Sequence, residues 1–254
     1  TIHLKIDTGM ERIGVHSYSA GPFIEAAAAS TWCILKGIYS HLACADDPAS
    51  PMTALQLERF NQACAHFERI GAPMPLRHLA NSGGVLHFPE TWLDIVRPGI
   101  ALYGVLPDPA SQPTIPLRPA LSLVSRVVFF KVVKAGNPVS YGATWASAVD
   151  TRVVTVPVGY GDGYPRALSS RGQVLLHGQP HPLVGRVCMD QFMVDIGPEG
   201  SAYNEDEVVL IGRQGEAAIS TEALAQRAGT IPYEILTGLN ERIPREYVGG
   251  ASSR

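Results

Sequence analysis

Polar residues recur where the hydrophobic segments of the first hundred residues end. Asp7 and His41 close two runs with strand character, and Arg97 closes a third. In a parallel sheet the carboxyl ends of the strands meet at one edge, where the following loops commonly carry reactive groups and hold phosphate. Arg12 follows the first of these strand ends within five residues. The order of residues therefore predicts a site at this edge of the sheet.

Two later loops have the makings of an anion cradle. The segment NSGG at 81–84 contributes Asn81 and the hydroxyl of Ser82. The segment RPGI at 97–100 contributes the backbone N–H groups of Gly99 and Ile100 near an expected helix start. A segment such as NSGG is also common as a plain turn. From the residues alone, both interpretations stay open.

Alternating strands and helices are expected to position these loops. Strands are predicted at 2–7, 34–41, 76–80 and 95–97, and helices at 21–29 and 51–70. Ser50 suits the N-cap of the second helix and Pro51 its first position. On the first strand, charged and polar residues share one face, which suggests a lined cavity. The alternation is typical of a parallel α/β barrel.

The pattern changes after a stretch with five prolines at 106–119. Such a composition commonly marks a linker, so we expect an α/β domain at 1–109 and an all-β domain at 110–254. Short β-rich runs are predicted at 121–133, 151–158, 173–176, 186–196 and 207–212. One helix is predicted at 221–228, with Ser220 or Thr221 as its cap. This pattern is typical of a small β-barrel or sandwich.

The composition is that of an ordinary globular protein. The net charge is -3, from 20 basic and 23 acidic residues, so the chain has no electrostatic attraction for nucleic acid or an anionic membrane. The four cysteines form no CxxC pair and supply no zinc spacing with the eight histidines, so we expect no metal, and reduced thiols in the cytoplasm. No apolar run approaches the roughly 20 residues that span a bilayer. The opening TIHLKID lacks a signal-peptide layout and begins so abruptly that we expect earlier elements of its domain to be missing.

Seven runs of sequence resemble alanine racemase, in the order of that family. They are HLKIDTGMERIGV at 3–15, YSHLACAD at 39–46, HLANSGG at 78–84, VRPGIALYG at 96–104, VSYGATW at 139–145, VGYGDGYPR at 158–166 and GRVCMDQFMVDI at 185–196. The resemblance covers nearly the whole chain. It implies the later strands of a (β/α)8 barrel followed by a complete β-domain. It also implies pyridoxal-phosphate-dependent racemisation of L- and D-alanine, which supplies D-alanine for bacterial cell walls.

One departure from the family concerns the lysine that binds the cofactor covalently. The family carries it in a VVKANAYGHG-like segment, which this sequence does not contain. The lysines present are Lys5, Lys36, Lys131 and Lys134, and none has that context. We therefore expect no covalent bond between this chain and the cofactor. Two alternatives stay open: a racemase of broader specificity, acting on serine or lysine, and an inert fragment that serves only as a dimerising domain.

The resemblance implies an acid-base role for Tyr141. Racemisation needs two acid-base groups on opposite faces of the α-carbon, and the family's tyrosine in this motif serves the L-alanine side. A free phenol titrates near pH ~10, too high for an efficient base at neutral pH. The resemblance makes His41 its hydrogen-bond partner, with Arg97 behind. Without it, His41 is equally a polar residue of a barrel mouth, and a lone tyrosine is usually a packing residue.

The resemblance places Arg97 against the pyridine nitrogen of the cofactor. A guanidinium cannot give up a proton, so the ring nitrogen would stay unprotonated and would delocalise the carbanion less. A short-lived carbanion suits racemisation and discourages transamination. Ser82, Gly99 and Ile100 would hold the cofactor phosphate, with Asn81 in support. The alternative for Arg97 is a structural salt bridge.

The remaining implied roles concern the substrate. Arg12 matches a residue near the cofactor phenol oxygen and the substrate carboxylate, and Lys5 matches a lysine that is carbamylated in some members. Pairing of Lys5 with Asp7 or with another buried carboxylate explains that lysine equally well. Met189 and Asp190 match a pair beside the substrate carboxylate.

Access to the site and assembly are also implied by the resemblance. Tyr160 matches a residue that narrows the entrance, although the residues alone favour core packing for it and for Met189. A homodimer is implied, in which Tyr141 and Met189 reach the barrel mouth of the partner subunit. Glu241 stands where some members carry a phosphate-binding tyrosine, so that contact is in doubt.

Overall fold

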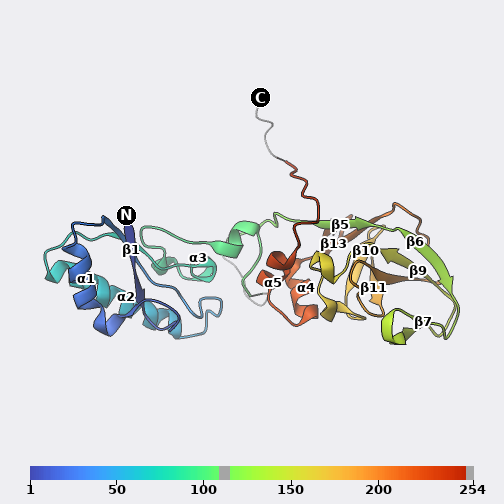
Figure 1. Ribbon diagram of the computed structural model, residues 1–254, viewed down its shortest axis with the longest axis horizontal. Helices are drawn as coiled ribbons and strands as arrows, with labels where there is room; N and C mark the ends of the chain where they lie inside the picture. The colour runs from blue at the N-terminus through green and yellow to red at the C-terminus, as the bar shows by residue number, and fades with distance from the viewer. Residues whose placement is uncertain (109–114, 250–254) are drawn as a thin grey trace, which may run out of the picture. The chain divides into compact units, whose positions relative to one another are not determined.

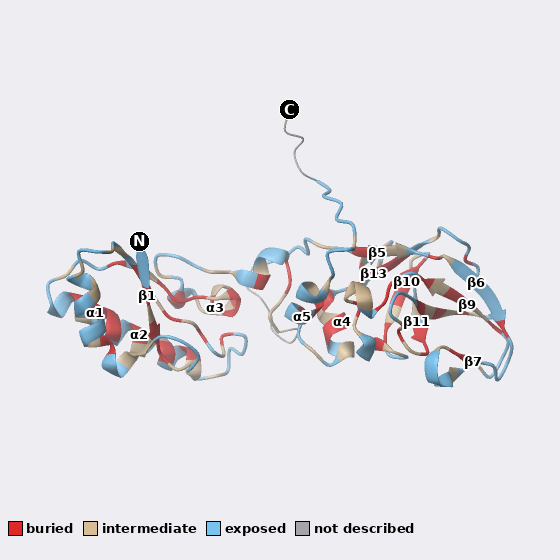
Figure 2. Ribbon diagram, viewed as in Figure 1, coloured by how far each residue is buried: buried red, intermediate tan, exposed pale blue. Residues whose placement is uncertain are grey.

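The structure of the chain is a computed structural model that describes residues 1–108 and 115–249. The chain divides into two compact units, residues 1–118 and 119–254 (Figure 1). Each unit has its own hydrophobic core, and Figure 2 shows the buried residues gathered on the inner faces of its elements. The domain boundary expected between residues 109 and 110 lies outside the described residues. In the described part of the chain, no helix is long and apolar enough to cross a membrane.

The first unit contains parallel strands with helices between them. Its elements are β1 (Ile2–Asp7), β2 (Val15–His16), β3 (Leu35–Tyr39) and β4 (Leu76–His78), the helices α1 (Ala20–Ala28), α2 (Met52–Arg69) and α3 (Ser82–His87), and the 3-10 helices η1 (Ser17–Ser19), η2 (Pro89–Thr91) and η3 (Gly99–Tyr103). The strands are ordered β2-β1-β3-β4, all parallel. The prediction of a mixed α/β unit is confirmed, with a four-stranded sheet.

Alternation along β1 separates the core from the polar face. Leu4 and Ile6 are buried in one cluster with Phe60 and Phe67 of α2, because successive side chains of a strand point to opposite faces. The other face of β1 carries Lys5 and its polar neighbours. Helix α2 therefore packs against the apolar face of β1, and the opposite face carries the polar side chains.

One sequence prediction for this unit was wrong, and one open interpretation is narrowed. Residues 95–97 form no strand, and Ile95 makes only an isolated bridge with His78. The pairing stops there because Pro98 has no N–H group and the chain turns into η3. The NSGG segment is more than a turn: it begins α3, where the side chain of Asn81 accepts from Gly84 N at 3.0 Å.

The second unit is mainly antiparallel. Its elements are β5 (Leu123–Arg126), β6 (Phe129–Val133), β7 (Pro138–Val139), β8 (Trp145–Ala146), β9 (Thr151–Val156), β10 (Gln173–Leu176), β11 (Gln179–Val184), β12 (Phe192–Gly197), β13 (Glu207–Gln214) and β14 (Ala217–Ile219), with α4 (Thr221–Ala228), α5 (Pro232–Gly238) and the 3-10 helices η4 (Tyr141–Ala143), η5 (Tyr160–Asp162) and η6 (Arg166–Leu168). One sheet runs β14-β13-β10-β11-β12-β9-β6, β5 also pairs with β13, and β7 pairs with β8.

The strand expected at 121–133 is in fact two strands. Its halves pair with different partners, β5 with β13 and β6 with β9. Between them, Val127 N donates to Asp206 O and Val128 N to Thr155 O, so the chain crosses from one neighbour to the other. The helix at 221–228 and its Ser220 cap are confirmed, because the hydroxyl of Ser220 accepts from the third helical residue at 3.1 Å.

Candidate functional site

A row of side chains crosses the polar face of the first sheet. The strand register sets Lys5 beside Tyr39, and Tyr39 beside His78. The ring of Tyr39 stacks on that of His78 with centroids 4.9 Å apart. Lys5 Nζ and Arg97 Cζ lie 5.4 and 5.5 Å from the Tyr39 centroid. The electron-rich face of the phenol ring stabilises both cations at this distance.

Arg97 joins the ends of β3 and β4. Its Nη1 donates to His78 Nδ1 at 2.7 Å, and its Nη2 donates to Ser40 O at 2.7 Å and Leu79 O at 3.1 Å. His41 Nδ1 lies 3.4 Å from the same Nη2. Among the described residues, no carboxylate lies within 4.0 Å of this guanidinium, so the salt-bridge interpretation finds no support there.

Both histidines that face Arg97 are neutral at neutral pH. A guanidinium can only donate, so His78 Nδ1 accepts and its Nε2 lies 2.7 Å from His3 Nδ1. Burial, the charge of Arg97 and His3 lower the pKa of His78 to about 4. Burial first, and then the charges of Arg97, Arg12 and Lys5, lower the pKa of His41 to about 4.

Lys5 lies among other cations. Burial lowers the pKa of Lys5 to about 8. The charge of Asp7 raises this pKa, and the charges of Arg97 and Arg12 lower it further. The pairing of Lys5 with Asp7 is not formed as a direct contact. Instead, Asp7 Oδ1 accepts from the N–H groups of residues 9, 10 and 11 at 2.8, 3.1 and 3.2 Å. Burial alone would raise the pKa of Asp7, but these hydrogen bonds and Lys5 lower it.

Lys5, Arg12 and Arg97, here called the cation cluster, share one property. Within the described ranges, none of them has a carboxylate within 4.0 Å. Arg12 is exposed, whereas Lys5 and Arg97 are half-buried. Half-buried charges normally have an opposite charge nearby. The charge and burial of the cluster are suited to an anionic ligand.

The two glycine-containing loops meet beside the strand ends. The Ser82 hydroxyl donates to Pro98 O and accepts from Ala101 N, the latter at 3.2 Å. A Cβ at Gly99, where φ is 42°, would lie 3.2 Å from Ser82 Oγ. The first N–H groups of η3, those of Gly99 and Ile100, have no acceptor within their own helix. The two backbone N–H groups make a donor set for phosphate, and the Ser82 hydroxyl joins it as a donor only when it releases Pro98 O.

A buried glutamine on α2 holds the loop that carries His41. Gln56 Nε2 donates to His41 O at 2.9 Å and to Thr8 Oγ1 at 3.1 Å, while its Oε1 accepts from Ala43 N at 2.8 Å. Both N–H donors of this amide and its carbonyl oxygen are used. The loops after β1 and β3 are thereby fixed to one helix.

Tyr141 stands on a strained turn of the second unit and is 72% exposed. Its neighbours Ser140, Gly142 and Ala143 have φ values of 70°, 74° and 49°. Ser140 Oγ anchors the turn by donating to Arg186 O at 2.7 Å. Left-handed backbone at non-glycine positions costs energy and tends to occur at functional sites. Tyr141 is thus presented outwards and is not a packing residue.

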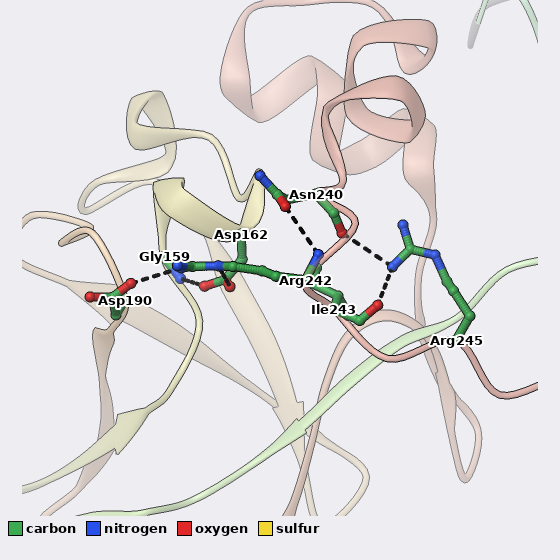
Figure 3. A network of polar contacts seen from close by, with 7 residues as sticks. All are labelled: Gly159, Asp162, Asp190, Asn240, Arg242, Ile243 and Arg245. Atoms are coloured by element: carbon green, nitrogen blue, oxygen red, sulfur yellow. Dashed lines mark hydrogen bonds and ion pairs between the residues drawn. The ribbon is translucent and has the colours of Figure 1, made fainter.

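Tyr160 and Met189 lie on adjacent backbone segments. Tyr160 N donates to Cys188 O at 3.1 Å, and Gly161 N donates to Met189 O at 2.8 Å. The side chains of Tyr160 and Met189 are 44% and 56% exposed, which corrects the expectation that they pack in the core. Asp190, expected at the substrate, forms an ion pair with Arg242 (Figure 3).

Sequence reasoning missed two residues that touch the expected site. His78 was overlooked because the strand was extended to Ala80, whereas β4 ends at His78, so the strand-end rule with the correct boundary finds it. Arg242 gave no signal, because its carboxylate partners lie 80 and 52 residues away along the chain.

The fold and the site define a class of protein: a parallel α/β unit with a cluster of cations at its strand ends, followed along the chain by an antiparallel β unit that presents an exposed tyrosine. Residues 1–107 match the family model described as "Alanine racemase, N-terminal domain", and residues 120–247 match "Alanine racemase, C-terminal domain". The chain belongs to the alanine racemase family.

Individual relatives agree with this assignment. An alanine racemase of Symbiobacterium thermophilum is 45% identical over 98% of this chain and 66% of its own length. The crystal structure of alanine racemase from Streptomyces lavendulae superposes with a TM-score of 0.93 at 40% identity, over 98% of this chain and 66% of that one. An alanine racemase from Bartonella henselae with covalently bound pyridoxal phosphate has a TM-score of 0.85 at 32% identity, over 96% of this chain and 66% of that one. The chain thus spans slightly less than two thirds of the length of these relatives.

Proposed function

We propose that this chain carries out its part of the pyridoxal-phosphate-dependent interconversion of L- and D-alanine, which supplies D-alanine for peptidoglycan. The observation that carries the proposal is the cation cluster, which has no carboxylate partner among the described residues and belongs to the same unit as the Ser82 loop. An anionic cofactor and an amino-acid carboxylate both satisfy such a site. The names of the relatives supply the substrate and the cofactor.

The residues present fit pyridoxal phosphate. Ser82 and the N–H groups of Gly99 and Ile100 form the donor set for its phosphate, and a Cβ at Gly99 would crowd that set. Arg97 would face the ring nitrogen, which it cannot protonate. When bound, the cofactor withdraws electrons from the α-carbon of the amino acid and makes its proton acidic. Arg12 would hold the substrate carboxylate.

Tyr141 and His41 would move the proton on the L-alanine side. The phenol oxygen of Tyr141 would take the α-proton, and neutral His41, whose Nδ1 accepts from Arg97, would donate a hydrogen bond from Nε2 to the phenol oxygen. The low pKa of His41 suits this role, because a neutral imidazole that accepts at Nδ1 has its proton on Nε2. Burial first, and then the charge of Arg97, keep His41 neutral, and Arg97 Nη2 lies 3.4 Å from its Nδ1.

The assembly is part of the proposal. The parallel sheet of the first unit would belong to a (β/α)8 barrel. The chain would form a homodimer, in which the exposed Tyr141 and Met189 would serve the barrel site of the partner subunit. The four free cysteines agree with a reducing compartment such as the cytoplasm.

The test uses an active enzyme in which this chain is joined to a segment with the family's cofactor lysine, and compares it with its Tyr141→Phe variant in deuterium exchange at the α-carbon of L- and D-alanine. We expect the variant to slow exchange from L-alanine by about 100-fold or more, and exchange from D-alanine far less. Equal slowing of both would contradict a one-sided base. A panel of L-serine and L-lysine would separate alanine racemisation from a broader specificity.

The lysine prediction has its own test. Incubation of this chain with pyridoxal phosphate and borohydride, followed by mass spectrometry, is expected to give no stoichiometric lysine adduct. Lys5 is the lysine to watch, because its pKa of about 8 leaves part of it as free amine. An adduct on Lys5 would overturn the prediction, whereas a chain with neither adduct nor activity would favour the inert-fragment alternative.

A further inference from the structure

Arg242 joins two carboxylates on separate segments of the second unit. Its Nε donates to Asp162 Oδ1 and its Nη2 donates to Asp190 Oδ1, both at 2.7 Å. Figure 3 shows the guanidinium between the two acids, with Asn240 and Arg245 to its right in this view. The planar group thus bridges η5, which contains Tyr160, and the loop that contains Met189.

The position of this guanidinium is set by the backbone around it. Asp162 Oδ2 accepts from Gly159 N at 2.8 Å, which leaves its Oδ1 directed to Arg242. Asn240 N donates to Asp162 O at 2.9 Å, and Asn240 Oδ1 accepts from Arg242 N at 3.0 Å. The carboxylate and the arginine are therefore each held by further hydrogen bonds.

Glycines let the three segments touch backbone to backbone. A Cβ at Gly161 would lie 2.7 Å from Arg242 Nη2 and 3.0 Å from Met189 O. A Cβ at Gly163, where φ is 95°, would overlap Gly238 O, and one at Gly159 would overlap Met189 O. No side chain separates the segments at these points. A shift of one segment would therefore displace the other two.

We propose that Arg242 is a positioning residue that sets the spacing between Tyr160 and Met189, and through it the size of the amino-acid side chain that the site accepts. In this assignment Asp190 holds Arg242 and does not contact the substrate. The inference rests on the proposed racemase function. Both of Arg242's carboxylate contacts are on segments that carry an exposed substrate-side residue.

The kinetic consequences differ from those of a lost catalytic group. The Tyr141 turn is anchored on an earlier part of the Met189 loop, where Ser140 Oγ donates to Arg186 O at 2.7 Å and lies 3.7 Å from Cys188 Sγ. Neither of these contacts involves the carboxylates that hold Arg242. Loss of the Arg242 contacts should therefore loosen substrate positioning while proton transfer continues. The contacts are charge-assisted but half-exposed, so their loss should change kinetic constants by about fivefold.

The experiment uses the active enzyme with Arg242→Gln, Asp190→Asn and Arg242→Lys. We expect Arg242→Gln to raise the KM for L-alanine by about fivefold with kcat within about twofold, and to lower the preference for L-alanine over L-serine by a similar factor. Asp190→Asn should act in the same direction, and Arg242→Lys should partly restore the preference. Arg245→Gln is the matched control: Arg245 donates to three carbonyls of its own segment, so its loss should leave the preference unchanged.

Hydrogen exchange tests the inference independently of activity. In Arg242→Gln, amides of residues 159–163 and 187–190 should exchange faster together, whereas those of the Tyr141 turn should not. An exchange rate that rises in neither segment would overturn the inference even if the enzyme is a racemase. A fall in kcat with unchanged KM and preference would also overturn it. If the wild type shows no racemase activity, the proposed function fails, and coupled exchange would still support the bridging contact.

Discussion

Replacing His78 by asparagine should make the stability of the first unit less sensitive to acid. His78 is 7% exposed and accepts a hydrogen bond from Arg97 at 2.7 Å. Asparagine has an acceptor at nearly the same place as Nδ1 but cannot take up a proton. The variant therefore keeps the bond to the guanidinium and removes the titration.

The magnitude follows from linkage. The pKa of His78 is about 4 in the folded chain and returns to about 6.5 on unfolding. As pH falls below 6.5, the unfolded chain binds a proton that the folded chain does not, so folding is weakened progressively until about pH 4. At about 1.4 kcal/mol per pH unit, the upper limit is roughly 3 kcal/mol, and we take about 2 kcal/mol because water reaches part of the site.

Urea unfolding at pH 7 and pH 4.5 measures the effect. A Trp145→Phe background leaves Trp32 and Trp92 as fluorescence reporters of the first unit. Between the two pH values, the free energy of unfolding should fall by about 2 kcal/mol more in the chain with His78 than in His78→Asn. An equal fall in both would refute the reasoning, because it would mean that His78 is not held neutral by its surroundings.

Lys5 should be acetylated faster than Lys134 at pH 8. Burial and neighbouring cations lower the pKa of Lys5 to about 8, whereas the hydrogen bond to Asp150 raises the pKa of Lys134. Brief treatment with acetic anhydride, followed by peptide mass spectrometry, gives the ratio of acetylated Lys5 to acetylated Lys134. Asn81→Ala should lower the free energy of unfolding by about 1 kcal/mol through loss of the α3 cap, as measured in urea. Tyr164→Phe should raise it by about 1 kcal/mol, because the Tyr164 hydroxyl is buried without a hydrogen-bond partner among the described residues; a higher Tm would show this.

Each of these outcomes can fail in a specific way. Equal labelling of Lys5 and Lys134 would contradict the lowered pKa of Lys5. An unchanged stability of Asn81→Ala would mean that α3 is held by its packing alone. A lower Tm for Tyr164→Phe would mean that the hydroxyl has a partner such as a buried water.

Local patterns in the sequence predicted the elements and their order. Alternation placed β1 at residues 2–7, and helical spacing with a proline start placed α2 within one residue at each end. The hydroxyl of Ser220 predicted the start of α4. These features depend on neighbours a few residues apart, so a single stretch of sequence contains the information.

What tertiary structure decided was which of those elements meet. Residues 121–133 form two strands because β5 pairs with β13 and β6 pairs with β9, and both partner strands lie tens of residues later in the chain. The low pKa of His78 depends on burial and on a guanidinium 19 residues away, and the bridge made by Arg242 spans 80 and 52 residues. Such contacts form only when the chain closes long loops, and no local pattern specifies which ends will meet. The sequence alone therefore determined which groups were present for chemistry, and the folded chain determined their charge states and neighbours.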